Sequence, residues 1–411
     1  MPTATMRLIP GLALLVTLAA AAGAQQKPRA RELGIPFNGS TGPLNAITDV
    51  AGIEVGQVTL IRGDGRMVVG RGPVRTGVTA VLPRGKNSSD PVMGAWWTLN
   101  GNGEMTGTTW LEESGFLWGP VMITNTLSVG IVRDAVIEWA IGRKYDDFLW
   151  ALPVVAETYD GGLNDIKGMH VRKEHAFQAL DGARTGPVAE GNVGGGTGMV
   201  CHSFKGGIGT SSRRLAATSG GYTVGVLVQC NYGGRRRLSI AGVPVGPRIV
   251  GAEQCLTIDN PSESWQREVP RCDAKPTGTG PSAAREELGS IIVVVATDAP
   301  LLPHQLKRLA KRVGLGIGRM GGIGGDSSGD IYLAFSTANP GAANPDSVVT
   351  LKMLPNDQIN PLFEATIDAT EEAIVNAMVA AETMTGADGY RVYALPVDQV
   401  LAQLRQAGRI P

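Results

Sequence analysis

A glycine-serine pair opens a run of β-branched residues past the middle of this 411-residue chain. Gly289 and Ser290 are followed by the apolar residues 291–296, a composition typical of a buried strand. A cut between the two residues would leave an N-terminal serine at the head of that strand, with a nucleophilic hydroxyl and a basic α-amine on one residue. The other interpretation is a plain turn into a core strand, which would hold in most proteins. The surrounding sequence has to decide between the two.

A second serine motif does not supply a histidine-assisted nucleophile. Residues 325–329 read G-D-S-S-G and fit the G-x-S-x-G pattern of α/β-hydrolases. In those enzymes the motif runs from a strand into a helix and the histidine follows it, whereas here a predicted strand at 331–335 follows and the last histidine is His304. A serine nucleophile in this chain is therefore expected to use another base, and the α-amine of Ser290 would provide one.

Polar side chains lie at the ends of several predicted strands. Ser328 and Asp330 come just before the strand at 331–335, Tyr159 follows a strand at 152–156, and Asn231 follows a strand that ends at Cys230. A phenol and an amide at strand ends are candidate donors to an oxyanion. Turn capping is the alternative for each of these residues, because such types are common in turns.

Strand and helix patterns alternate along the chain, which predicts an α/β or α+β layered domain. Lys and Arg together number 37, as do Asp and Glu, and this balance argues against nucleic-acid binding. Residues 233–288 are rich in Pro, Ser, Gly and charge, so we expect an exposed linker there. The predicted strands are 54–61, 77–82, 151–156, 224–228, 291–296 and 331–335, and the predicted helices are 132–143, 303–313 and 370–384.

The first 24 residues have the pattern of a secretory signal peptide. Arg7 precedes an apolar stretch at 12–22, and small residues end at Ala24, where we expect cleavage. A membrane anchor is the alternative, but the stretch is shorter than the ~20 residues that a spanning helix needs. The sequence therefore predicts an exported protein, periplasmic or secreted.

Four cysteines are compatible with disulfides in an exported protein. Cys255 and Cys272 bracket a polar, proline-containing insertion, which a bridge would close. Cys201 and Cys230 are expected to be buried thiols. No cysteine or histidine spacing matches a zinc site, so we predict neither a metal nor a cofactor.

Several long segments resemble one family, the L-aminopeptidase/D-esterase and β-aminopeptidase family of DmpA-type self-processing peptidases, which is related to the ornithine acetyltransferases. The similarity extends from about residue 35 to residue 395. The matching segments are N-G-N-G-E-M-T-G at 100–107, I-T-N-T-L-S-V-G at 123–130, P-V-V-A-E-T-Y-D-G-G-L-N-D-I at 153–166, G-G-G-T-G-M-V-C-H-S-F-K-G-G-I-G-T-S-S-R at 194–213, V-L-V-Q-C-N-Y-G at 226–233, A-T-D-A-P-L-L-P-H-Q-L-K-R-L-A at 296–310 and S-G-D-I-Y-L-A-F-S-T-A-N at 328–339.

This resemblance implies self-cleavage of the Gly289–Ser290 bond, which would divide the mature chain into an α-subunit of residues 25–289 and a β-subunit of residues 290–411. It also implies a four-layer α/β/β/α sandwich similar to N-terminal nucleophile (Ntn) hydrolases, and a homo-oligomer of processed heterodimers. By the same resemblance Ser290 is the nucleophile, Ser328 and Asp330 are its supporting hydroxyl and carboxylate, and Tyr159 and Asn231 stabilise the oxyanion. The insertion between Cys255 and Cys272 makes the segment before Ser290 longer than is usual in the family.

We therefore expect a self-processing serine aminopeptidase that removes N-terminal residues from short peptides, amino-acid amides or esters. A substrate ammonium would need an acidic partner, for which Glu104 and Asp146 are candidates. The alternative is an acyl or aminoacyl transferase that passes the same acyl-enzyme to an amine. A third possibility, a binding protein that never cuts itself, is disfavoured because Ser290 and its expected partners are all present.

Overall fold

Two β-sheets lie face to face in the computed structural model, which describes residues 27–143, 152–274 and 289–411. The first sheet has the order β1-β2-β5-β6, with the strands Glu54–Arg62, Val74–Leu82, Val121–Asn125 and Val154–Thr158. The second has the order β4-β3-β15-β14-β10-β9, with the strands Phe116–Leu117, Val92–Gly101, Ser328–Ser336, Gly289–Thr297, Thr223–Asn231 and Gly207–Arg214. Apolar side chains from both sheets, such as Ile123, Ile292 and Leu333, are fully buried in one core between them.

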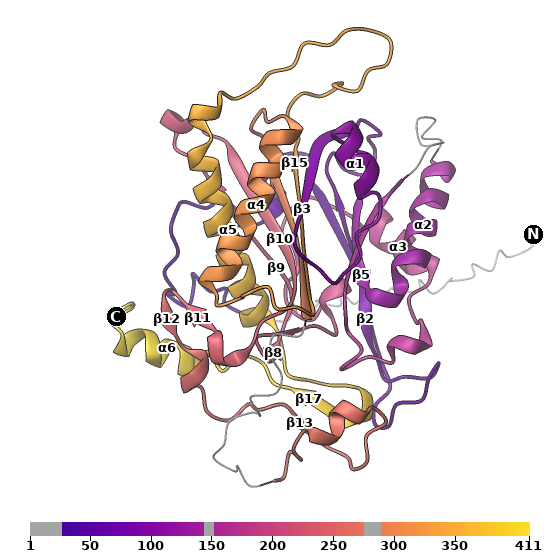
Figure 1. Ribbon diagram of the computed structural model, residues 1–411, viewed down its shortest axis with the longest axis vertical. Helices are drawn as coiled ribbons and strands as arrows, with labels where there is room; N and C mark the ends of the chain where they lie inside the picture. Colours follow the sequence, from indigo (N-terminus) through magenta and orange to yellow (C-terminus); the bar gives the residue numbers. More distant parts are fainter. Residues whose placement is uncertain (1–26, 144–151, 275–288) are drawn as a thin grey trace, which may run out of the picture.

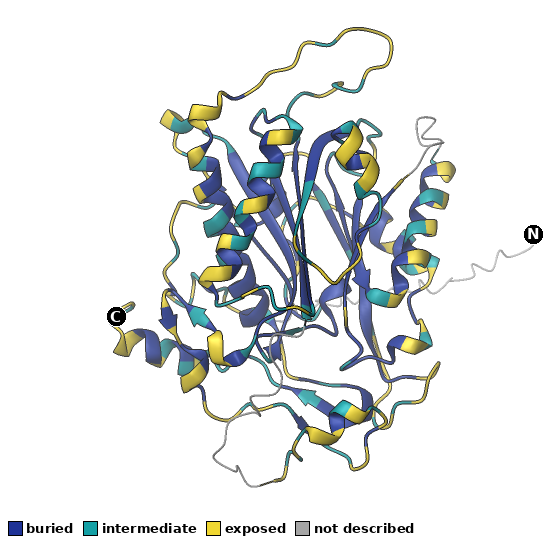
Figure 2. Ribbon diagram, viewed as in Figure 1, coloured by how far each residue is buried: buried dark blue, intermediate teal, exposed yellow. Residues whose placement is uncertain are grey.

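Helices cover the outer face of each sheet, which makes four layers in the order α/β/β/α (Figure 1). The helices α2 (Val129–Gly142) and α3 (Lys173–Asp181) pack on the first sheet. The helices α4 (Pro303–Arg319) and α5 (Asn360–Ala380) pack on the second. Figure 2 shows that both helical layers turn their buried sides toward the sheets and their exposed sides outward. This arrangement confirms the predicted fold class.

Two helix ends differ most from the sequence prediction. Helix α4 continues past Gly314, where we expected it to stop. Gly316 within this helix serves packing, because a Cβ there would lie 2.9 Å from the Ile367 carbonyl oxygen of α5. Helix α5 begins at Asn360 rather than at Thr370, whose hydroxyl donates to the Thr366 carbonyl inside the helix. The short helices α1 (Thr108–Ser114) and α6 (Val397–Gln406) complete the α-helices of the described residues.

Part of the predicted linker belongs to the core instead. Leu238, Ile240 and Val245 are fully buried against the helix-covered face of the second sheet. The prediction of an exposed linker is therefore wrong for residues 238–249, where Ala241, Val243 and Ile249 are buried as well. The short strands here and nearby are β11 (Ser239–Ile240), β12 (Val243–Pro244), β7 (Val200–Cys201) and β8 (Phe204–Lys205).

The insertion closed by Cys255 and Cys272 lies on a small third sheet. This sheet has the order β13-β17-β16, with the strands Cys255–Leu256, Tyr390–Val392 and Met384–Thr385. The structure contains the Cys255–Cys272 disulfide, with 4.9 Å between the Cα atoms. The predicted signal peptide of residues 1–24 lies outside the described residues, and no helix within the described part is long and apolar enough to cross a membrane.

A second disulfide joins Cys201 to Cys230, so the expectation of two buried thiols is wrong. The fold brings the end of β7 beside the end of β10, and the two Cα atoms are 5.6 Å apart, within the range that a disulfide spans. The two cysteines are 29 positions apart in the sequence, and nothing in the sequence indicated this contact.

Candidate active site

The predicted junction lies at the start of the central strand β14. Ser290 is paired with Asn231 of β10 on one side and with Gly329 of β15 on the other. Ser290 is 4% exposed, and Gly289 is part of the same strand. The fold therefore brings three separate segments of the chain together at this serine, although they are far apart in sequence.

Gly289 occupies a position that admits no side chain. Its φ is +147°, a value that favours glycine, and a Cβ there would lie 2.0 Å from the carbonyl oxygen of Asn231. The absence of a side chain lets the junction approach the backbone of Asn231 directly. The glycine before the serine is therefore required by the packing of β14 against β10.

Ser328 and Asp330 form a buried pair beside the junction. The Ser328 hydroxyl donates to Asp330 Oδ1 over 2.8 Å, and both residues are fully buried. Side chains alternate along strands, so Ser290 points with Ile292 toward the core between the sheets, whereas the pair points with Tyr332 toward the helices. The Ser290 nitrogen lies in the plane between these faces. This placement suits action on the α-amine rather than on the serine hydroxyl.

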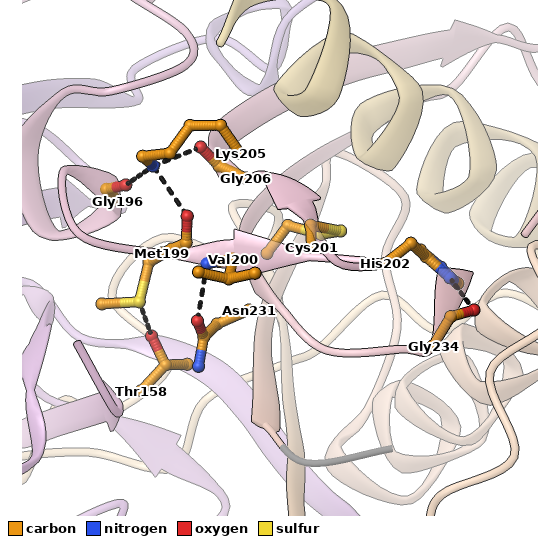
Figure 3. The surroundings of a disulfide bond; sticks show 11 residues. Thr158, Gly196, Met199, Val200, Cys201, His202, Lys205, Gly206, Asn231 and Gly234 are labelled. Atoms are coloured by element: carbon orange, nitrogen blue, oxygen red, sulfur yellow. Dashed lines mark hydrogen bonds between the residues drawn. A yellow bond between two sulfur atoms is a disulfide. The ribbon is translucent and has the colours of Figure 1, made fainter. Parts of the chain in front are cut away.

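Asn231 is held by two hydrogen bonds. Its Oδ1 accepts from the Val200 backbone N–H over 2.8 Å (Figure 3). Its Nδ2 donates to the Tyr159 carbonyl over 3.0 Å. An amide nitrogen carries two hydrogens, so the second remains for a reacting group. Because Asn231 is directly opposite Ser290 in the sheet, its side chain lies on the same face as the serine hydroxyl.

Tyr159 contacts the site residue Asn231 through its backbone. Its carbonyl oxygen accepts from Asn231 Nδ2, while the residue is 51% exposed. The phenol lies over Gly161, where a Cβ would be 2.3 Å from the hydroxyl oxygen. The structure thus brings the backbone of Tyr159 to the site, and the phenol lies beside it.

Glu157 is an acidic residue of the site that sequence reasoning missed. It lies on β6, is 3% exposed, and accepts hydrogen bonds from the Thr126 hydroxyl and from the backbone N–H of Glu104. A Cβ on Gly103 would lie 3.3 Å from Glu157 Oε1 and 3.4 Å from the Cα of Gly329, so the carboxylate lies close to the strand position beside Ser290. Burial raises the pKa of this carboxyl group.

Of the two acidic candidates chosen from the sequence, only Glu104 lies in the described part of the structure. The side chain of Glu104 is exposed, and its backbone rather than its carboxylate contacts the site residue Glu157. Asp146 lies outside the described residues. A glutamate inside the apolar strand V-V-A-E-T was the sequence signal that could have identified Glu157.

The disulfide-closed insertion borders Tyr159. Glu263 of the insertion forms an ion pair with Lys167 over 2.9 Å, and Trp265 would lie 3.8 Å from a Cβ on Gly162. Burial raises the pKa of the Tyr159 phenol, and the negative charge of Glu263 raises it further. The insertion is therefore in a position to affect access to this side of the site.

No metal-binding arrangement occurs in the described ranges, where no group of three or more His, Cys, Asp or Glu side chains could hold an ion. The functional groups gathered at Ser290 are a hydroxyl, an amide, a Ser–Asp pair and a buried carboxylate. Together these groups can support nucleophilic attack on a carbonyl carbon and stabilise the resulting negative charge.

Comparison with known proteins agrees with this arrangement. The model of Peptidase family S58 matches residues 45–392. The chain is 54% identical to β-peptidyl aminopeptidase BapA of Sphingosinicella microcystinivorans over 96% of both chains, and 48% identical to β-peptidyl aminopeptidase BapA of Sphingosinicella xenopeptidilytica over 98% of both.

Solved structures show the same similarity. A β-aminopeptidase of Burkholderia sp. superposes with a TM-score of 0.80 at 47% identity, covering 93% of this chain and all of that one. The L-aminopeptidase D-Ala-esterase/amidase of Ochrobactrum anthropi superposes with a TM-score of 0.81 at 46% identity, covering 94% of this chain and all of that one. It is described as a prototype of the serine aminopeptidases and a new variant of the Ntn hydrolase fold. These relatives favour hydrolysis over the acyl-transfer alternative. The chain belongs to Peptidase family S58 and is a hydrolase of the aminopeptidase type.

Proposed function

We propose that the chain cleaves its own Gly289–Ser290 bond and then uses Ser290 to remove N-terminal residues from short peptides, amino-acid amides or esters. The observation that carries this proposal is the position of Ser290. It begins a central strand directly opposite the amide of Asn231, after a glycine that packing requires.

In the self-cleavage step, Ser290 Oγ attacks the carbonyl carbon of Gly289. The C–N bond breaks, the Ser290 nitrogen takes the proton from the hydroxyl, and an ester joins the two parts of the chain. Water then hydrolyses the ester, which leaves a carboxylate on Gly289 and a free α-amine on Ser290. The strand pairing of Ser290 with Gly329 holds this amine next to Ser328 and Asp330.

In the mature enzyme, the α-amine accepts the hydroxyl proton as Ser290 attacks the substrate carbonyl. Ser328 and Asp330 hold this amine and stabilise its protonated form, since the carboxylate carries a negative charge. Asn231 Nδ2 donates to the oxyanion, a contribution typically worth about 3 kcal/mol of barrier, and Tyr159 is the proposed second donor. The proton passes to the leaving amine, and water hydrolyses the acyl-enzyme.

The substrate's free ammonium is proposed to bind Glu157, in preference to Glu104. Glu157 is the more buried of the two carboxylates, and an ion pair is stronger where solvent is excluded. The names of two relatives at 54% and 48% identity support N-terminal β-amino-acid residues as substrates, and the Ochrobactrum enzyme's name supports L-amino-acid residues.

Export is proposed as well. The signal-like pattern of residues 1–24 supports it, and so do the two disulfides, because disulfides persist mainly in oxidising compartments. Amino-terminal sequencing of the protein from its native host tests this proposal. A mature chain that begins at Gln25 is expected, and one that retains Arg7 contradicts it.

A panel of aminoacyl p-nitroanilides tests the activity. Purified protein that has cleaved itself is expected to release p-nitroaniline from β-alanyl and L-alanyl substrates, and not from their N-acetylated forms, which carry no ammonium. Glu157→Gln serves as the matched variant, expected to bind the free-amine substrates more weakly. Equal release from N-acetylated substrates would contradict the proposed role of Glu157, and no release from any member would contradict the proposed activity.

A further inference from the structure

Lys205, at the end of β8, is a buried lysine that the proposed mechanism does not use. It is fully buried, and its ammonium donates to the carbonyls of Met199 over 2.7 Å, Gly206 over 2.9 Å and Gly196 over 3.4 Å. None of these three acceptors is a carboxylate. Burial lowers the pKa of Lys205 to about 7, and the negative charge of Asp160 acts in the opposite direction. A buried amine without a direct counter-ion is costly, so its retention needs a reason.

One of these three acceptors connects Lys205 directly to the active site. The Met199 carbonyl and the Val200 N–H belong to a single planar peptide unit. Lys205 binds the oxygen of this unit, and Asn231 Oδ1 accepts from its N–H over 2.8 Å. Figure 3 shows the lysine and the asparagine on the two sides of this peptide.

The chain around the peptide is fixed at two more points. The Gly196 carbonyl, which Lys205 also binds, belongs to the glycine-rich turn 194–196 that precedes Met199. On the other side, the disulfide joins Cys201, the residue after Val200, to Cys230, the residue before Asn231. The Val200 N–H therefore has little freedom to move relative to the Asn231 side chain.

We propose that Lys205 is a positioning residue for the oxyanion donor Asn231, acting through the Met199–Val200 peptide. This inference rests on the proposed function, in which Asn231 Nδ2 donates to the oxyanion. Protonated Lys205 on the carbonyl polarises the peptide and strengthens its N–H as a donor, since consecutive hydrogen bonds reinforce one another. The peptide in turn fixes the orientation of the Asn231 amide, so that Nδ2 rather than Oδ1 faces the reacting carbonyl.

The first test compares Lys205→Met, which keeps the length of the side chain but removes its donors, with the wild type. A misplaced oxyanion donor costs up to about 100-fold in rate, so we expect kcat to fall about 10- to 100-fold and KM to change by less than about 2-fold. Lys205→Gln keeps two donors, so its kcat is expected to lie between those of Lys205→Met and the wild type. It replaces Lys205→Met in this test if Lys205→Met does not fold. An unchanged kcat in either folded variant would overturn the proposal.

The matched control is Arg235→Met. Arg235 is another buried cation that binds backbone carbonyls, those of Ile249, Gly251 and Ala252, and none of these peptides is hydrogen-bonded to Asn231. If losing a buried cation's hydrogen bonds to carbonyls acts only by lowering the stability of the fold, Lys205→Met and Arg235→Met lower kcat by similar factors. That result would overturn the proposal. We expect Arg235→Met to lower the unfolding temperature while kcat stays within about 2-fold of the wild type.

A double-mutant cycle tests whether Lys205 acts through Asn231. In the Asn231→Ala background the donor is absent, so Lys205→Met is expected to lower kcat and the self-cleavage rate by less than a further 2-fold. The same fold-loss in both backgrounds would overturn the proposal. If Asn231→Ala leaves no measurable turnover, hydrogen exchange of the Val200 amide decides the question.

Hydrogen exchange also separates this inference from the proposed function. Lys205→Met is expected to speed exchange of the Val200 amide at least about 10-fold, and Arg235→Met to leave it unchanged. Unchanged exchange in Lys205→Met refutes the positioning role even if the protein is an active peptidase. A wild-type protein that neither cuts itself nor releases p-nitroaniline would instead refute the proposed function, while exchange still reports on the peptide.

Discussion

Replacing Gly289 by alanine should stop self-cleavage although the nucleophile stays intact. The Cβ of the new residue would lie 2.0 Å from the Asn231 carbonyl oxygen. Non-bonded atoms in contact lie about 3.5 Å apart, so relief of this overlap requires a shift of roughly 1.5 Å between β14 and β10. The shift separates Ser290 from the Asn231 amide, and a misplacement of about 1 Å costs on the order of 100-fold in rate.

We therefore expect Gly289→Ala to slow conversion of the precursor at least about 100-fold. The assay follows the full-length chain and its two fragments on denaturing gels after a pulse of expression. The matched control is Gly251→Ala, which also has a positive φ (+67°) but whose Cβ would meet no atom of the described chain within 4 Å. Gly251→Ala bears only the backbone strain, about 1–2 kcal/mol, and is expected to cleave at the wild-type rate. Cleavage of Gly289→Ala within a few-fold of the wild-type rate would show that the contact of Gly289 with the Asn231 carbonyl does not control self-cleavage.

Three further outcomes are expected. Burial lowers the pKa of His202 to about 4, so between pH 6.5 and pH 4 the unfolded chain binds a proton that the folded chain does not. As the pH falls through this window, the wild type should lose about 3 kcal/mol of its free energy of unfolding relative to His202→Asn, as measured by urea unfolding. Glu157→Gln should raise KM for free-amine substrates about 10- to 100-fold. The wild-type KM should rise as the pH falls through the raised pKa of Glu157, because only the carboxylate binds an ammonium, and a wild-type KM that does not change with pH in steady-state assays contradicts this. Glu372→Gln should cost about 3–5 kcal/mol in denaturant unfolding, because it leaves the buried Arg213, 2.8 Å from Glu372, without its counter-ion.

The strands around the junction were predictable from local sequence. The β-branched run after Ser290 and the apolar run before Asn231 coincide with β14 and β10, since such residues fit a buried sheet whatever surrounds them. The helix ends were not predictable in this way. Gly316 in α4 satisfies a contact with α5, and only the packed structure shows that contact.

The parts of the site that come from long-range contacts were less accessible to sequence reasoning. Glu157 appears in the sequence as one polar residue in an apolar strand, and its position beside Gly329 depends on how the two sheets face each other. Lys205 binds backbone carbonyls, which every residue has, so no side-chain pattern could indicate its partners. The Cys201–Cys230 disulfide likewise depends on β7 and β10 lying side by side.

The central claim is that Ser290 is both the site of self-cleavage and the catalytic nucleophile. Intact-mass and amino-terminal analysis of purified wild type and Ser290→Ala tests it most directly, together with p-nitroaniline release by both proteins. We expect two wild-type fragments, the smaller beginning at Ser290, and a single inactive chain for Ser290→Ala. An uncut wild-type chain that is active, or a Ser290→Ala chain that is cut or active, would contradict it.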